Sequence, residues 1–190
     1  MSNTNDVRGA EDKTDPWRDD VVAMIPHLRA FAQSLSRNAA DADDLVQECL
    51  IKAWSHRESF TPGTNLRAWL FTILRNTFYT MTRKRQREVA DPSGAYAATL
   101  RSEPVQEWRA QLEDLRRALD SLPAHHRESL ILVAAAGLSY EEAAEICGCA
   151  VGTIKSRVNR ARAQLAGLLN PSDGAPDKGG VIDSLLALAA

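Results

Sequence analysis

Hydrophobic residues recur three or four positions apart along most of this chain, which is the period of an amphipathic α-helix. The clearest stripe falls at steps of four, three and four and consists of Ile154, Val158, Ala161 and Leu165. Similar stripes cover residues 16–35, 41–54, 66–85 and 108–133. The pattern predicts an all-α protein built from helices of ordinary length.

Proline and polar residues interrupt the stripes in the front half. Pro26 lies inside the stripe of residues 16–35, and because proline breaks or kinks a helix interior, we expect two short helices there. Residues 38–40 form a break, after which Asp41 is the predicted N-cap of the next helix. Pro62 and Gly63 mark a loop before the helix predicted for residues 66–85.

Residues 137–165 predict two short helices that meet at a tight turn. Ser139 occupies an N-cap position and Glu142 follows three residues later, which is the spacing of a capping box. Gly148 can adopt the left-handed conformation that ends a helix. The second helix begins near Val151 and turns its apolar stripe inward, so the segment has the organisation of a helix-turn-helix.

The outer face of that second helix carries small and basic side chains, and the helix contains no acidic residue. Small residues let a helix enter a DNA major groove, where hydroxyl and amide groups reach base edges and guanidinium groups hold phosphate or guanine. The alternative is a basic face that is merely solvated. Cap, turn and basic face agree with one another, which favours DNA recognition. The candidate contacts are Thr153, Lys155, Ser156, Arg157, Asn159 and Arg160.

A second cationic surface is predicted on the helix of residues 66–85. Basic and aromatic side chains interleave on its outer side, a combination that suits single-stranded nucleic acid. Trp69 and Phe78 follow the apolar stripe and are predicted to belong to the core. The candidate contacts to melted DNA are Arg75, Asn76, Tyr79, Arg83 and Lys84.

Composition and charge limit the ways in which this chain can bind its partners. The 190 residues are 44% hydrophobic and 25% charged, with a formal net charge of -2 and a pI of about 6.1, which argues against tight DNA binding by the free chain. Charge is segregated instead: residues 75–87 hold five bases and no acid, and residues 41–48 hold four acids and no base. Two opposite patches predict two different partners.

No motif of an enzyme or a metal site is found. Glycine-rich phosphate loops and nucleophile elbows are missing, and the three cysteines lack zinc spacing, so we expect no catalytic residue, no metal and no cofactor. His125 and His126 are predicted to be surface residues. The polar N-terminus and the lack of a long apolar run predict a cytoplasmic protein without a membrane partner.

The sequence of residues 137–165, preceded by LDSLPAHHRESLILVAAA, resembles region 4 of the extracytoplasmic-function (ECF) sigma factors of bacterial RNA polymerase. In that family this helix-turn-helix reads the upstream promoter element. DADDLVQECLIKAW is similar to the part of region 2 that docks on the clamp helices of core RNA polymerase. The resemblance implies core-binding roles for Asp43, Asp44, Gln47, Glu48 and Trp54.

The resemblance also assigns the second cationic helix to region 2, where the family recognises and opens the downstream promoter element. The preceding loop helps hold an unstacked base in the family, which implies roles for Phe60 and Asn65. Two small helical domains joined by a flexible linker are therefore expected. The predicted boundaries are a disordered N-terminus at 1–15, region 2 at 16–87, a linker at 88–106, region 4 at 107–170 and a C-terminal tail at 171–190.

The stretch PGTNLRAWLFTILRNTFYTMTRKRQRE resembles the EcfG-like sigma factors of the general stress response. That group implies core RNA polymerase, promoter DNA and a NepR-like anti-sigma factor as partners. Two alternatives stay open: a sigma-mimic decoy that binds an anti-sigma factor without DNA, and a helix-turn-helix regulator that works without polymerase. The basic recognition helix, and the lack of a receiver-like pattern after residue 170, favour a true sigma factor over a decoy.

Overall fold

The computed structural model describes residues 15–88 and 107–169, and within them it is helical with no strand, as predicted. The predictions for residues 1–14, 89–106 and 170–190 lie outside the described residues. The elements are α1 (Pro16–Ser36), α2 (Ala39–Ser55), the 3-10 turn η1 (Arg57–Ser59), α3 (Leu66–Glu88), α4 (Glu107–Ser121), α5 (Ala124–Leu130), the π-helical turn η2 (Ile131–Ala135), α6 (Tyr140–Cys147) and α7 (Val151–Leu169).

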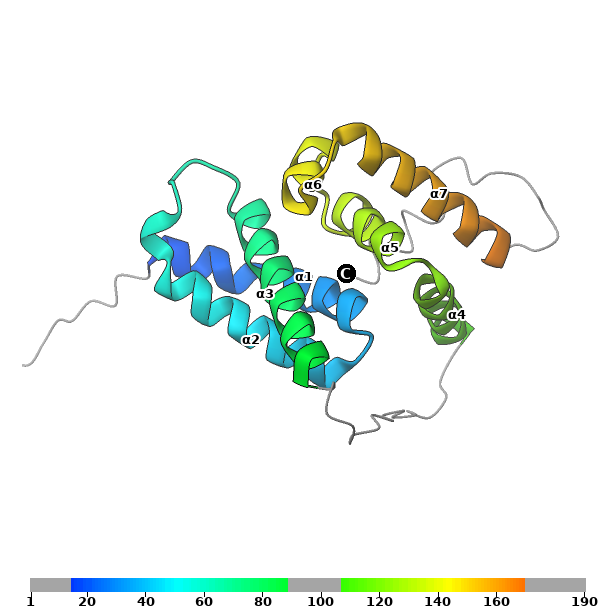
Figure 1. The fold of residues 1–190 in the computed structure, drawn as a ribbon, viewed down its shortest axis with the longest axis horizontal. Coiled ribbons are helices and arrows are strands. Elements are labelled where there is room, and N and C mark those ends of the chain that lie inside the picture. Colours follow the sequence, from blue (N-terminus) through cyan, green and yellow to red (C-terminus); the bar gives the residue numbers. More distant parts are fainter. Residues whose placement is uncertain (1–14, 89–106, 170–190) are drawn as a thin grey trace, which may run out of the picture.

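The helices form two groups that lie side by side (Figure 1). Helices α1, α2 and α3 pack against one another and are called here the N-terminal bundle. Helices α4 to α7 form the C-terminal bundle, in which α4, α5 and α6 each contact α7. The bundles meet where α3 contacts α6 and where α1 contacts α5 and η2.

Helix α1 is a single helix, so the prediction of a break at Pro26 is wrong. Proline removes the hydrogen bond to the carbonyl four residues earlier, here that of Val22. Val22 is 53% exposed and Pro26 is also exposed, so water can hydrate that carbonyl. Burial of Leu28 and Phe31 on the opposite side keeps the helix continuous across the proline.

The start of α2 also differs from the prediction. Asn38, rather than Asp41, is the N-cap: its side-chain oxygen accepts from the amides of Ala40 at 2.8 Å and Asp41 at 3.4 Å. The helix therefore begins at Ala39. Asn and Asp are nearly equivalent caps, so cap preference alone did not distinguish the two positions.

The predicted helix-turn-helix is confirmed in detail. The Ser139 hydroxyl accepts from the Glu142 amide at 3.1 Å, and the Glu142 carboxylate accepts from the Ser139 amide at 2.8 Å, which completes the capping box. Gly148 ends α6 with φ of 64°, in the left-handed region. The predicted stripe of α7 is fully buried, at Ile154, Val158, Ala161 and Leu165.

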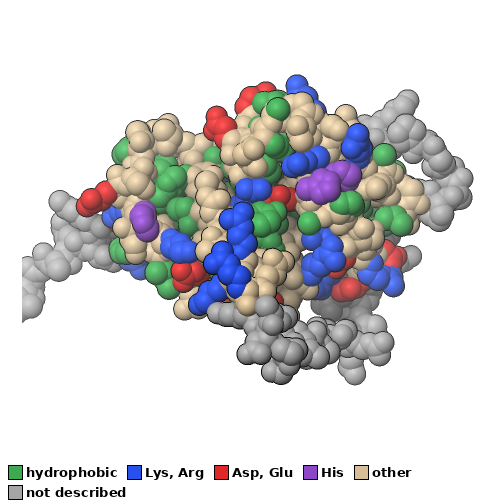
Figure 2. Space-filling view, in the orientation of Figure 1, with side chains coloured by type: hydrophobic (Ala, Val, Ile, Leu, Met, Phe, Trp, Pro, Cys, Tyr) green, Lys and Arg blue, Asp and Glu red, His purple; other side chains and the backbone are tan. Residues whose placement is uncertain are grey.

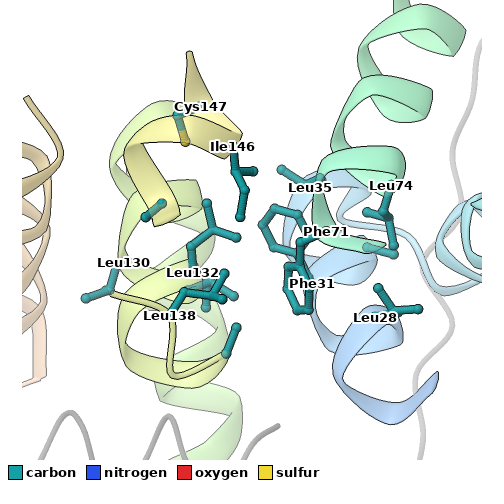
Figure 3. Packing of buried hydrophobic residues seen from close by; sticks show 14 of the residues in the cluster. Leu28, Phe31, Leu35, Phe71, Leu74, Leu130, Leu132, Leu138, Ile146 and Cys147 are labelled. Atoms are coloured by element: carbon teal, nitrogen blue, oxygen red, sulfur yellow. The ribbon is translucent and has the colours of Figure 1, made fainter. Parts of the chain in front are cut away.

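One continuous hydrophobic core joins the two bundles (Figure 3). Phe31 of α1 and Phe71 of α3 stack with ring centroids 5.0 Å apart, and both are fully buried. Figure 3 shows Leu132 and Ile146 of the C-terminal bundle facing this aromatic pair. The core therefore extends across the boundary between the bundles.

The adjacent histidines of α5 differ in environment. His125 is exposed, as predicted, but His126 is buried, so the prediction of a surface position is wrong for His126. Its Nδ1 lies 3.4 Å from the side-chain oxygen of Gln164 on α7. His126 thus belongs to the packing between α5 and α7.

The described residues contain no group of three or more His, Cys, Asp or Glu residues arranged to hold a metal ion. None of their helices combines the length and the apolar character that crossing a membrane requires.

Candidate nucleic-acid and polymerase-binding surfaces

The outer face of α7 carries the residues predicted to contact the upstream element. Lys155, Asn159 and Arg160 are exposed, whereas Thr153, Ser156 and Arg157 are half-buried. Gly152 is also exposed, and a Cβ built there meets no atom within 4 Å. This end of α7 therefore presents small side chains, open space and positive charge, as a helix that enters a groove requires.

Two contacts hold cations of this face in place. The Lys155 ammonium lies 5.7 Å from the centre of the Tyr140 ring on α6, a cation–π distance that links the two helices of the motif. The Arg157 guanidinium lies 3.9 Å from the Cys149 sulfur in the turn. Arg157 is thus half-buried against the turn, whereas Lys155 stays exposed beside Tyr140 and Arg160 is exposed to solvent.

The second cationic surface follows α3. Figure 2 shows Lys and Arg side chains gathered in a band over this helix, in the middle of the molecule. Arg83, Lys84 and Asn76 of the predicted set are exposed. Asn76 borders a hollow of about 320 Å³ between α2 and α3, whose wall also includes Trp69, Ile73 and Thr80.

Two of the residues predicted to contact the downstream promoter element bind one carboxylate of the C-terminal bundle. Arg75 Nε donates to Glu128 Oε1 of α5 at 2.6 Å, and the Tyr79 hydroxyl donates to Glu128 Oε2 at 3.3 Å. Arg75 also lies over the Tyr79 ring at 4.7 Å. Burial, followed by the Glu128 charge, raises the pKa of Tyr79 above its ordinary value, so its hydroxyl stays a donor at neutral pH.

The two loop residues predicted to contact the downstream promoter element also make contacts within the protein. The Phe60 ring packs on Trp69, with centroids 5.4 Å apart. The Asn65 side-chain oxygen accepts from the Ala68 amide at 3.2 Å at the start of α3, and its amide group donates to the Glu142 carboxylate. Asn65 thus joins α3 to the first helix of the helix-turn-helix.

The residues predicted to bind polymerase lie on α2. Asp44 and Gln47 are exposed, and Trp54 is 58% exposed with its ring 5.6 Å from that of Trp17. Asp43 pairs with Arg29 at 2.6 Å and Glu48 with Lys52 at 3.3 Å, both on the surface. Helical spacing places Asp44, Gln47 and Trp54 on one exposed side of α2.

Sequence reasoning missed two residues of these surfaces. Ile51 is 53% exposed and lies four residues after Gln47, so it adds an apolar centre to the α2 face. The signal was available, because Ile51 falls outside the buried stripe of the helix. Glu128 was also missed, and no local pattern marks it, because its partners lie about fifty residues earlier in the chain.

Comparison with known proteins identifies the class. The Sigma-70 region 2 family matches residues 21–88, and the Sigma-70 region 4 family matches residues 112–165. The solved structure of the sigma factor RpoE in complex with the anti-sigma factor NepR from Bartonella quintana superposes with a TM-score of 0.74 at 50% identity, over 83% of this chain and 99% of that one. CnrH in complex with the cytosolic domain of CnrY superposes with a TM-score of 0.61 at 29% identity, over 83% and 89%.

These matches define a sigma factor of the two-region type. The ECF RNA polymerase sigma factor EcfG of Rhodopseudomonas palustris (strain TIE-1) is 61% identical over 166 residues, which cover 87% of this chain and 91% of that protein. The chain belongs to the ECF RNA polymerase sigma factors and is EcfG-like within them. The resemblance inferred from the sequence is therefore confirmed.

Proposed function

We propose that this chain binds core RNA polymerase, directs it to promoters and assists DNA melting at the start of transcription, for genes of the general stress response. The observation that carries the proposal is the α7 face, where Lys155, Asn159 and Arg160 project from a capped helix-turn-helix. A cationic face with an amide at its centre suits combined phosphate and base contact in a major groove.

The α2 face supports polymerase binding. Trp54 and Ile51 supply exposed apolar area, and Asp44 and Gln47 add polar groups beside them. An aromatic anchor with apolar and polar neighbours is typical of the centre of a protein interface. This surface is on α2 and the helix-turn-helix is on α6 and α7, so the two proposed contacts use different helices.

The α3 surface supports the melting role. Arg83 and Lys84 can follow a phosphate backbone, and Asn76 at the hollow beside Trp69 can contact an unstacked base. The formal net charge of -2 fits a chain that binds DNA weakly alone. Polymerase then raises the effective concentration of both DNA surfaces at the promoter.

A small anti-sigma protein is the regulator we propose for this chain. NepR is bound to the Bartonella quintana relative and CnrY to CnrH. The EcfG similarity supports the NepR-like type and the stress response assignment. Co-purification from stressed and unstressed cells tests this: we expect a small protein in the unstressed fraction and polymerase subunits after stress.

Run-off transcription tests the main proposal. Purified chain and core polymerase are combined on a genomic promoter library, and we expect discrete transcripts that core enzyme alone does not make. The double variant Lys155→Ala/Arg160→Ala should lose them, because both cations are exposed on α7. Arg116→Ala, which removes an exposed cation from α4, is the matched control and should transcribe normally.

Run-off transcription and a gel shift without polymerase distinguish the two alternative functions. A decoy would yield no transcript from any promoter, although an anti-sigma protein would bind it. A regulator that works without polymerase would shift duplex DNA in a gel at physiological salt without core enzyme. Either result would replace the sigma-factor proposal.

A further inference from the structure

His125 of α5 is an exposed side chain whose ring nitrogens have no hydrogen-bond partner among the described residues. Its ring meets that of His126 edge to face, with the centroids 4.5 Å apart. His126 is buried, and its Nδ1 faces the side-chain oxygen of Gln164 on α7. His125 therefore lies against a packed neighbour and keeps its own ring nitrogens available to a ligand.

Cations of the recognition helix lie near this ring. Helices α5 and α7 pack against each other, and the positive charges of Arg157 and Arg160 act on the His125 imidazole. Figure 2 shows His side chains at the surface over α5, next to Lys and Arg side chains. The cationic face of α7 thus continues onto α5 at His125.

These neighbours disfavour a charge on His125 in the free chain. Loss of water contact, followed by repulsion from His126 and from Arg157, lowers the pKa of the His125 imidazole below its ordinary value. Arg160 acts in the same direction. The Glu128 carboxylate opposes them, but both of its oxygens already accept hydrogen bonds from α3. The imidazole is therefore mainly neutral near pH 7.

A DNA phosphate reverses this balance. A helix in the major groove is flanked by the phosphates of both strands, and a residue on the neighbouring helix meets the backbone before it meets a base edge. The negative charge offsets the repulsion from Arg157 and Arg160 and favours the protonated ring. A protonated imidazole carries two N–H donors and no acceptor, which suits phosphate oxygens.

We propose that His125 is a further contact of the upstream DNA surface, where its protonated imidazole donates to a backbone phosphate. This inference rests on the proposed function, because it takes the α7 face as a DNA contact. DNA binding then takes up one proton at His125. Affinity therefore rises as pH falls, by at most about 10-fold per pH unit, and levels off once the free chain is itself protonated.

The first test measures duplex binding by the full-length chain between about pH 8 and about pH 6. The probe is the upstream segment of a promoter recovered by run-off transcription, at about 50 mM salt and with a dye that does not titrate in this range. We expect wild-type affinity to rise by about 10-fold as pH falls. His125→Gln stays neutral and should change by less than about 2-fold.

Two further variants control this measurement. His125→Lys carries a permanent charge at the same position, so it should bind at the higher pH about as tightly as the wild type binds at the lower pH. His27→Gln removes a histidine of α1 in the N-terminal bundle and should keep the wild-type pH dependence. Loss of the pH dependence in His27→Gln would assign the proton to another part of the chain.

The second test locates the phosphate. Single phosphates of the probe are replaced one at a time by uncharged methylphosphonates. At one position the replacement should remove the pH dependence of the wild type and leave that of His125→Gln unchanged. If changes of a base pair remove it instead, the ring contacts a base edge and the phosphate contact is overturned.

The outcomes distinguish this inference from the proposed function. An equal pH dependence in the wild type and His125→Gln would overturn the His125 contact while run-off transcription continued. Loss of run-off in the wild type would overturn the proposed function. If the free chain binds the duplex too weakly to measure, the ratio of wild-type to His125→Gln affinity is measured with core polymerase present. That ratio must rise as pH falls, and a constant ratio overturns the inference.

Discussion

At the scale of single residues, the Glu142 carboxylate makes two structural contacts. Its carboxylate closes the capping box of α6 and accepts a hydrogen bond from Asn65 of the N-terminal bundle. The Ser139 backbone amide, followed by the Asn65 side chain, lowers the pKa of Glu142 below its ordinary value. A single carboxylate thus stabilises the start of the helix-turn-helix and the contact between bundles.

This gives a pH dependence with a definite sign. Because the folded pKa is lowered, the stabilisation by ionised Glu142 is present above the unfolded pKa of about 4.3 and is lost as pH falls through the folded value. We expect urea unfolding from about pH 6 to about pH 3 to show a smaller loss of stability in Glu142→Gln than in the wild type. An equal loss would contradict this, and Glu145→Gln is the control.

Trp54 permits a second residue-scale prediction. Its exposed ring forms the aromatic part of the α2 face, and truncation removes contact area from the proposed polymerase interface. We expect Trp54→Ala to weaken core polymerase binding by about 10-fold or more in a fluorescence titration. Val22→Ala, which truncates a similarly exposed apolar residue of α1, should bind normally, and equal weakening in both would contradict the assignment.

At the scale of elements, the helix-turn-helix depends on its N-cap. Ser139→Ala removes the hydroxyl that accepts from the Glu142 amide, and Ala cannot replace it. We expect the free energy of unfolding to fall by about 1 kcal/mol, measured by urea denaturation. Ser139→Asp keeps an acceptor and should retain most of the stability; equal loss in both variants would show that the cap contributes nothing.

The sequence predicted those elements that are specified by residues close together in the chain. The capping box, the left-handed Gly148 and the stripe of α7 are all properties of neighbouring residues, and each is confirmed. Pro26 and Asn38 show the limit of this reasoning. Proline is tolerated where packing holds the helix and water reaches the freed carbonyl, and these conditions depend on tertiary structure.

At the scale of the whole molecule, the contact between the bundles lay beyond sequence reasoning. Phe71, His126 and Glu128 are buried, yet local patterns place none of them in a contact between distant helices. Glu128 meets Arg75 from 53 residues away, and the charge pattern of either helix alone indicates a solvated face. The α3 surface was predicted from its own residues, but its contact with α5 depends on how the two bundles meet.

The shared core leads to a last prediction, on unfolding. A chain of two independent domains melts in two steps, whereas a continuous core couples the bundles into one cooperative unit. We therefore expect calorimetry of the full-length chain to give one transition, with equal calorimetric and van't Hoff enthalpies. Phe71→Ala, which removes a fully buried ring next to the C-terminal bundle, should cost about 3–5 kcal/mol.

The form of the Phe71→Ala transition decides between the two descriptions. If the bundles unfold together, the single transition moves to lower temperature as a whole, because the lost packing belongs to the common core. If the bundles are independent, one transition moves and the C-terminal one stays in place. Ile51→Ala alters an exposed side chain of the same bundle and should leave the melting profile unchanged, which separates loss of packing from loss of an apolar residue.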